Sequence, residues 1–206
     1  MNKQWPEVIY RFFLEEWQAG AFLDGNIWIS TLTKCREYED NERGDKEEGY
    51  EKTHSGTLYG SSEDTVFVEK AANMGIEIGP GCSNCTIKNS TKVIAIQDAY
   101  ILCTSLSASI SRNFGKYGVE ITNPEEFFRR VSQTLSLQGL CGAVDYTTQR
   151  DRNVGEKLQK HPAFIKPLQY KAQQEFRFLW YPQSMDGLMP LSLNCPDVKA
   201  LCVKIN

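Results

Sequence analysis

Short apolar runs broken by polar turns follow one another along the chain, in the pattern of β-strands. The clearest run covers residues 173–181, in which Phe176 and Phe178 alternate with polar side chains. Residues two apart share one face of a strand, so Gln173 and Glu175 are expected to point together into a cleft while the two phenylalanines face a core. Further strands are predicted at 8–12, 26–30, 56–60, 65–68, 92–96, 99–107, 141–146 and 198–205.

Helical spacing is present in two other segments. Apolar residues recur three to four positions apart between residues 12 and 23, before an Asp-Gly turn. A second helix is predicted to begin at Pro124, because Asn123 can cap it and proline is tolerated at the first helical position. The charged segment 34–52 lacks the carboxylate spacing of a calcium loop and is predicted to be a solvated loop or frayed helix. Short strands with helices outside them predict the α+β class.

Three of the predicted strands carry a polar group that an ordinary core strand does not need. Arg11 lies among aromatic residues, the strand at 99–107 ends in small hydroxyls, and Glu175 follows Gln173 by two residues. In chain order they give Arg, then Ser, then Gln-x-Glu. This order resembles the ADP-ribosyltransferase superfamily of the Arg-Ser-Glu type. The resemblance implies one ADP-ribosyltransferase-like domain over residues 1–206, with a split, mainly antiparallel β core and peripheral helices.

The resemblance also implies a chemistry in which NAD is the substrate and its ADP-ribose is transferred. Cleavage of the nicotinamide–ribose bond builds positive charge on the ribose, which a fixed carboxylate stabilises; Glu175 is the expected carboxylate. The family's Ser-Thr-Ser is Cys103-Thr104-Ser105 here, so either Ser105 or, with a shift of two residues, Ser107 is expected to hold Glu175 and the ribose. Arg11 is expected to bind the diphosphate or the adenosine-side ribose. The other expected NAD contacts are Thr104, Ser107 and Tyr117.

Gln173 occupies the position that touches the acceptor nucleophile in the family. An amide there favours amide, hydroxyl or nucleobase acceptors over arginine, so RNA or a protein side chain is the expected macromolecular acceptor. Small members of this kind resemble bacterial toxins of toxin–antitoxin or phage-defence systems, which implies a neutralising antitoxin protein as partner. Three alternatives stay open: an NAD glycohydrolase, a non-catalytic module that binds a nucleotide or RNA, and a structural or regulatory zinc-dependent protein.

Several residues near these motifs allow more than one interpretation. Arg177 shares a strand face with Glu175, so it could contact phosphate or acceptor, or pair with Glu175 itself. Phe114 and Tyr117 could stack on nicotinamide or an acceptor base, or pack in a core. A nucleophilic pair of Cys103 with His161 is a further alternative.

The composition of the chain says more about its cellular location than about its chemistry. The chain has 206 residues, seven cysteines and a formal net charge of −3, so it offers no global attraction to nucleic acid, and any such contact needs a local patch. An odd number of cysteines within apolar runs fits a reducing compartment. No run is long enough to cross a membrane, and the expected location is the cytoplasm. Cys82 and Cys85 have the spacing of half a zinc site without a second half, so no metal is predicted.

Overall fold

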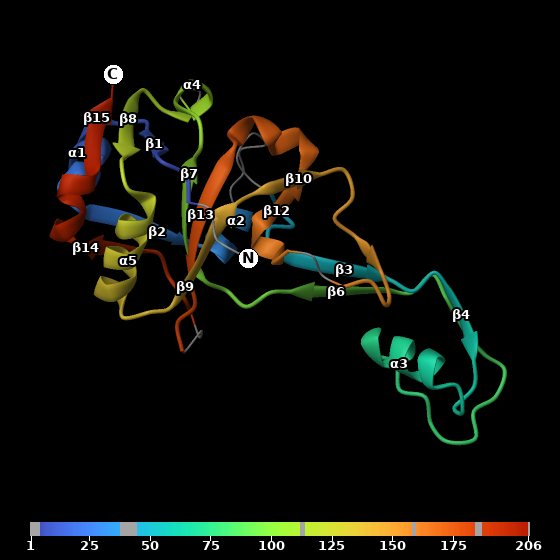
Figure 1. Ribbon diagram of the computed structural model, residues 1–206. Coiled ribbons are helices and arrows are strands. Elements are labelled where there is room, and N and C mark those ends of the chain that lie inside the picture. The colour runs from blue at the N-terminus through green and yellow to red at the C-terminus, as the bar shows by residue number, and fades with distance from the viewer. Residues whose placement is uncertain (1–4, 38–44, 112–113, 158–159, 184–186, 206) are drawn as a thin grey trace.

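The computed structural model describes residues 5–37, 45–111, 114–157, 160–183 and 187–205. Over these residues the chain is an α+β structure with a mainly antiparallel central sheet (Figure 1), which confirms the fold class. The main sheet contains β1 (Ile9–Phe13), β2 (Asn26–Thr31), β7 (Tyr100–Ser105), β8 (Tyr117–Ile121), β9 (Gly139–Ala143), β13 (Glu175–Trp180), β14 (Leu191–Asn194) and β15 (Cys202–Ile205).

Strand β7 is where the main sheet divides. One edge of β7 pairs over its whole length with β13, which pairs in turn with β9. The other edge is shared, since β2 pairs with Tyr100 and Ile101 whereas β1 pairs with Ser105. Between these two contacts the described strands leave this edge of β7 open over residues 102–104. The sheet therefore splits beside the middle of β7, and side chains can enter the gap.

The larger core lies under α1 (Glu16–Leu23) and α5 (Pro124–Leu135), which pack on one face of the sheet. Strand β13 contributes Phe176, Phe178 and Trp180 to this core, as its alternating pattern predicts. Burial of each such aromatic side chain stabilises the fold by roughly 2–3 kcal/mol. The opposite face of β13 carries the intervening residues Glu175, Arg177 and Leu179, and only Leu179 joins the smaller apolar cluster there.

Helix α5 begins where its sequence predicts. The side chain of Asn123 accepts a hydrogen bond from the backbone N–H of Glu126 (3.0 Å), and Pro124 occupies the first turn. Helix α1 begins later than predicted, at Glu16, because residues 9–13 belong to β1 and pair with β8. No helix among the residues described is long and apolar enough to cross a membrane.

An arm projects from the main body (Figure 1). We use this name for residues 56–90, which contain β4 (Thr57–Gly60), α3 (Thr65–Asn73) and β5 (Cys85–Lys88). Two strands, β3 (Tyr50–His54) and β6 (Thr91–Ala95), join it to the body, with β11 (Arg152–Asn153) beside β3. The remaining elements are α2 (Leu32–Arg36), α4 (Ala108–Ser111), β10 (Asp145–Thr147), η2 (Pro162–Phe164), β12 (Ile165–Pro167), η3 (Leu168–Gln173) and η4 (Pro196–Leu201).

Three of the predicted strands are wrong in whole or in part. The strand predicted at 141–146 is divided between β9 and β10, which lie in different sheets. Residues 65–68 begin α3, because the Asp64 carboxylate accepts from the backbone N–H of Phe67 (3.0 Å) and the helix then buries Phe67 and Ala71 on one side. An N-cap of this kind outweighs a short β-favouring run. The C-terminal strand begins only at Cys202, since residues 196–201 form the turn η4.

Candidate functional site

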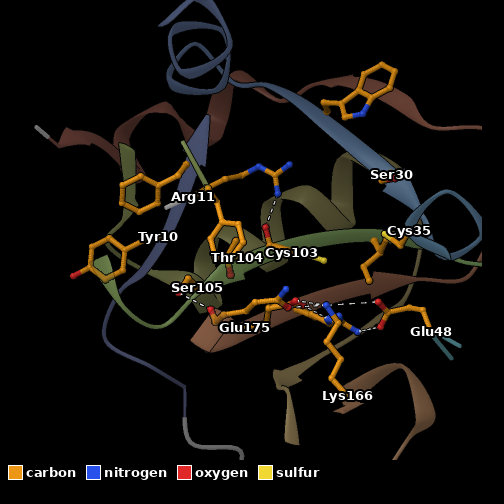
Figure 2. Close-up of a pocket in the computed structure, with 16 residues that line it drawn as sticks. Tyr10, Arg11, Ser30, Cys35, Glu48, Cys103, Thr104, Ser105, Lys166 and Glu175 are labelled. Carbon is orange, nitrogen blue, oxygen red and sulfur yellow. Dashed lines mark hydrogen bonds and ion pairs between the residues drawn. The ribbon is translucent and has the colours of Figure 1, made fainter. Parts of the chain in front are cut away.

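A cavity of about 280 Å³ is lined by β1, β2, β7 and β13 at the point where the sheet divides (Figure 2). Residues of α2, β12 and η3 complete its wall. Five of the predicted site residues line it, and they come from segments far apart in the chain. These are Arg11, Thr104, Ser105, Gln173 and Glu175.

Arg11 extends from β1 across the split in the sheet. Its Nη1 donates to the backbone carbonyl of Cys103 (2.5 Å), on the edge of β7 that no described strand covers. A buried carbonyl without a partner would cost about 1–3 kcal/mol, so the guanidinium takes the place of a missing strand. Arg11 thereby bridges the split and brings a positive charge to the cavity.

Glu175 lies in a buried ion network with Lys166, Arg177 and Glu48. Its Oε1 accepts from Lys166 Nζ (2.5 Å) and its Oε2 from Arg177 Nε (2.5 Å). Arg177 Nη1 also donates to the Glu48 carboxylate and to a backbone carbonyl in η2. The side chains of Lys166, Arg177 and Glu48 are at most 3 % exposed. Two carboxylates and two cations therefore cancel in charge within the wall of the cavity.

The network keeps Glu175 ionised. Burial alone would raise the pKa of Glu175, but the positive charges of Arg177 and Lys166 and their hydrogen bonds lower it to about 2. The phenol oxygen of Tyr146 accepts from the backbone N–H of Glu175 (2.8 Å). Burial raises the pKa of Tyr146, so this phenol stays neutral. Glu175 is thus a fixed carboxylate at every pH near neutrality.

Gln173 reaches the same cavity by a route that differs from the prediction. It ends the turn η3, and Gln174 adopts a left-handed conformation (φ 42°), so β13 begins only at Glu175. The side chains of Gln173 and Glu175 nevertheless converge, because Lys166 Nζ donates to Oε1 of both, at 2.8 Å and 2.5 Å. An ammonium group only donates, so Lys166 fixes which end of the Gln173 amide faces it.

Ser105 is paired with Glu175 through the backbone ladder and not through its hydroxyl. The two residues lie directly opposite each other in the β7–β13 pair. The Ser105 hydroxyl donates to the backbone carbonyl of Gln173 (3.0 Å), so it positions the turn before Glu175. The expected hydroxyl contact with the carboxylate is therefore replaced by a contact with the backbone that precedes it.

The other predicted NAD contacts divide. Thr104 lines the cavity, although its hydroxyl donates to the backbone of β13 (2.7 Å). Phe114 also lies in the cavity wall. Ser107 and Tyr117 are not among the described residues that line it; Ser107 follows the end of β7, and Tyr117 begins β8.

Two members of the network, Glu48 and Lys166, are not predicted from the sequence. Glu48 lies in the charged segment predicted to be solvated, yet it is 2 % exposed; residues 38–44 of that segment lie outside the described residues. Nothing in a run of carboxylates distinguishes the one that is buried. Lys166 had a signal, since it stands alone among apolar residues before a proline. Of the two interpretations of Arg177, the structure supports the ion pair with Glu175.

Neither a metal site nor a cysteine–histidine pair is formed in the part of the chain described. No group of three or more possible metal ligands occurs there, and Cys82 and Cys85 lie in the arm. The imidazole of His161 contacts the Tyr181 hydroxyl (3.0 Å) through Nε2, while the thiol of Cys103 contacts another cysteine. The cysteine–histidine alternative therefore lacks its contact.

Comparisons with protein families, with curated proteins and with solved structures found no match. The chemistry of the cavity is the remaining guide to function. It combines a fixed carboxylate, an arginine at the split in the sheet, an amide and four aromatic side chains, those of Tyr10, Phe12, Trp28 and Phe114. Such a set suits a ligand with an anionic group, a hydroxyl-bearing part and a planar ring.

Proposed function

We propose that this protein is an NAD-dependent ADP-ribosyltransferase that transfers ADP-ribose to a macromolecular acceptor. One observation carries the proposal. Arg11, Ser105 and Glu175 come from three segments remote in sequence and lie on β1, β7 and β13, which are consecutive neighbours in the sheet and line one cavity. The order Arg, Ser, Gln-x-Glu along the chain is thus matched by a single site in space.

Glu175 supplies the carboxylate that stabilises the reacting ribose. A carboxylate has about four lone-pair directions, and Lys166 and Arg177 occupy two of them, so others can accept from a ribose hydroxyl. The two ion pairs hold the group in place before the substrate arrives, which lowers the reorganisation needed as positive charge develops. Glu48 offsets one of the cations and so preserves part of the negative field at Glu175.

Arg11 supplies the charge for the diphosphate. The four charges of the buried ion network cancel. With Arg11 included, these five residues carry one net positive charge. A planar guanidinium with five N–H donors suits phosphate oxygens. Phe12 and Phe114, in the same wall, offer faces for a planar ring.

Gln173 reads the acceptor. Its amide lies beside the Glu175 carboxylate, because both groups accept hydrogen bonds from Lys166. An acceptor nucleophile would meet the reacting carbon at this position. An amide favours an RNA base or a protein side chain over arginine. The biological setting that goes with this proposal is a cytoplasmic toxin of a toxin–antitoxin or phage-defence system, held inactive by an antitoxin protein.

A non-catalytic nucleotide-binding module is the second candidate, and one feature favours it. Both oxygens of Glu175 already contact cations, which weakens the negative field that an oxocarbenium-like ribose would feel. Such a module would bind NAD or a related nucleotide through Arg11 and release no nicotinamide.

Incubation with NAD labelled in the adenosine half, with total RNA and total protein offered separately, tests the proposal. Transfer predicts label on one fraction, with loss of label in Glu175→Gln and a much smaller loss in Glu48→Gln, which perturbs the same network away from the ribose. Nicotinamide release without label on either fraction would identify an NAD glycohydrolase. Binding of NAD without release would identify the second candidate and contradict the proposal.

A further inference from the structure

Two thiols face each other in the wall of the cavity. Cys35 comes from α2 and Cys103 from β7, and both line the cavity (Figure 2). Both pack against one apolar cluster that includes Leu32 and Leu179, and the two thiols are close enough for each to shift the pKa of the other. Both are free thiols, half-buried in the fold. Neither has a role in the chemistry proposed above.

The two thiols differ in their readiness to ionise. The hydrogen bond with Cys103 lowers the pKa of Cys35, although burial and the Glu48 charge act in the opposite direction. The same hydrogen bond, together with burial, raises the pKa of Cys103 well above its ordinary value. The thiolate is the reactive form of cysteine, so Cys35 is the attacking group and Cys103 the resolving one.

We propose that Cys35 and Cys103 form an oxidation site, at which hydrogen peroxide converts the two thiols into a disulfide between α2 and β7. The Cys35 sulfur attacks one peroxide oxygen and the O–O bond breaks, giving a sulfenic acid and, with the thiol proton, one water. The Cys103 sulfur then attacks the sulfenic sulfur, the S–O bond breaks, and the second water leaves with the second thiol proton. The protein loses two electrons and two hydrogens, and the peroxide is reduced to two waters.

The position of the pair favours a small oxidant and gives the bond a consequence. The cavity of about 280 Å³ admits peroxide to sulfurs that a bulky disulfide reagent would reach poorly. The backbone carbonyl of Cys103 accepts a hydrogen bond from Arg11 Nη1. A disulfide at Cys103 that moves this backbone would therefore also move the Arg11 guanidinium. A fall in NAD affinity on oxidation follows from this contact; that consequence rests on the proposed function, whereas the disulfide does not.

Peptide mapping of the native protein tests the site. The reduced protein is treated with hydrogen peroxide, its remaining thiols are alkylated, and the digest is searched for cross-linked peptides. We expect a Cys35–Cys103 linked peptide, loss of two alkylatable thiols, and full reversal by dithiothreitol. Cys35→Ser and Cys103→Ser should each abolish the link. A double Cys82→Ser, Cys85→Ser variant, which removes the thiol pair of the arm, should form it as the wild type does.

Two outcomes would overturn the proposal. One is oxidation of Cys82 or Cys85 while Cys35 stays fully alkylatable; the other is over-oxidation of Cys35 to a sulfinic acid with no linked peptide. The wild-type digest decides both, so the answer survives a variant that folds poorly. NAD affinity of the reduced and oxidised forms is measured separately. A linked peptide in a protein that never binds NAD would leave this site intact and count against the proposed function alone.

Discussion

Glu175 in the cavity and Glu126 on α5 are both held by two cationic side chains, yet they differ in what surrounds them. Glu126 accepts from Arg129 and Arg130 at 2.6 Å on α5, where its side chain is 26 % exposed. Those hydrogen bonds lower its pKa to about 2, as Arg177 and Lys166 do for Glu175 against the effect of burial. The Glu126 carboxylate can exchange its partners for water, whereas the Glu175 side chain is only 11 % exposed and has much less access to water.

This difference shows why equal pKa values do not mean equal contributions to stability. An exposed ion pair is screened and its removal is nearly silent. Removal of one partner from a buried pair leaves the other charge without compensation, although the intact pair contributes little net stability. Because buried ion pairs add little net stability, the presence of this network is better explained by function. It holds a fixed carboxylate that faces the cavity.

The largest effect is expected from Glu175→Gln. The sequence alone predicts a nearly unchanged fold, but the structure shows that this change leaves the two buried cations, Arg177 and Lys166, with Glu48 as the one remaining anion of the network. We expect a loss of about 3–5 kcal/mol in the free energy of unfolding and a fall of at least about 100-fold in transfer. Urea unfolding measures the first and labelled NAD the second. A variant with wild-type stability would contradict the network.

The pH dependence of that stability difference isolates the charge on Glu175. The pKa of Glu175 is about 2 in the folded chain, against about 4.3 for an ordinary glutamate. Its stabilisation is therefore complete above the unfolded pKa and is lost as the pH falls through the folded pKa. The difference between wild type and Glu175→Gln should be constant near neutrality and shrink below about pH 4. Glu126 is present in both proteins and cancels; a difference independent of pH would contradict the assignment.

Lys166→Met is expected to have a smaller effect than Glu175→Gln. The methionine fills much of the same volume, and Glu175 keeps its pair with Arg177. We expect a loss of about 2 kcal/mol in stability and a higher pKa of Glu175, because one of its two cations is gone. Carboxyl carbon NMR of the two proteins reports that pKa. No rise in the pKa would show that Lys166 does not act on Glu175 in solution.

Ser105→Ala should cost less again. It leaves the backbone carbonyl of Gln173 without its hydroxyl partner, which costs about 1–2 kcal/mol, and it loosens the turn before Glu175. Transfer should fall less than in Glu175→Gln. Ser107→Ala is the comparison, and a larger loss of transfer at Ser107 would show that the serine motif is shifted by two residues.

The smallest effect is expected from Glu126→Gln, the exposed counterpart of Glu175→Gln. Water can solvate Arg129 and Arg130 once the carboxylate is gone, so the urea midpoint should be unchanged. Transfer should also be unchanged, since α5 lies on the face of the sheet opposite the cavity. A destabilisation similar to that of Glu175→Gln would remove the contrast between the two sites.

Elements with their own local signals could be predicted from the sequence. Helix α5 carries its cap at Asn123 and its first-turn acids, and β13 carries an alternating pattern that separates Glu175 from Phe176. Both were predicted because the residues that decide them are adjacent in the chain. Helix α3 was mistaken for a strand because its decisive feature is a single cap, Asp64, before a β-favouring run.

The rest of the site depends on contacts that no local pattern records. Glu48 is buried only because Arg177, far along the chain, lies against it. Cys35 meets Cys103 only because α2 lies beside β7. The edge of β7 is open because β1 and β2 diverge along it. The sequence does not show where along β7 each of these strands pairs. Long-range partners, and not the identity of single residues, were what the sequence lacked.

Nicotinamide release from NAD is the measurement that tests the central claim most directly. Wild type, Glu175→Gln and Glu48→Gln are compared at a temperature where circular dichroism shows all three folded. The account predicts release by wild type, a loss of at least about 100-fold in Glu175→Gln, and a much smaller loss in Glu48→Gln. Equal release by wild type and Glu175→Gln, or no release by a folded wild-type protein with either acceptor present, would contradict it.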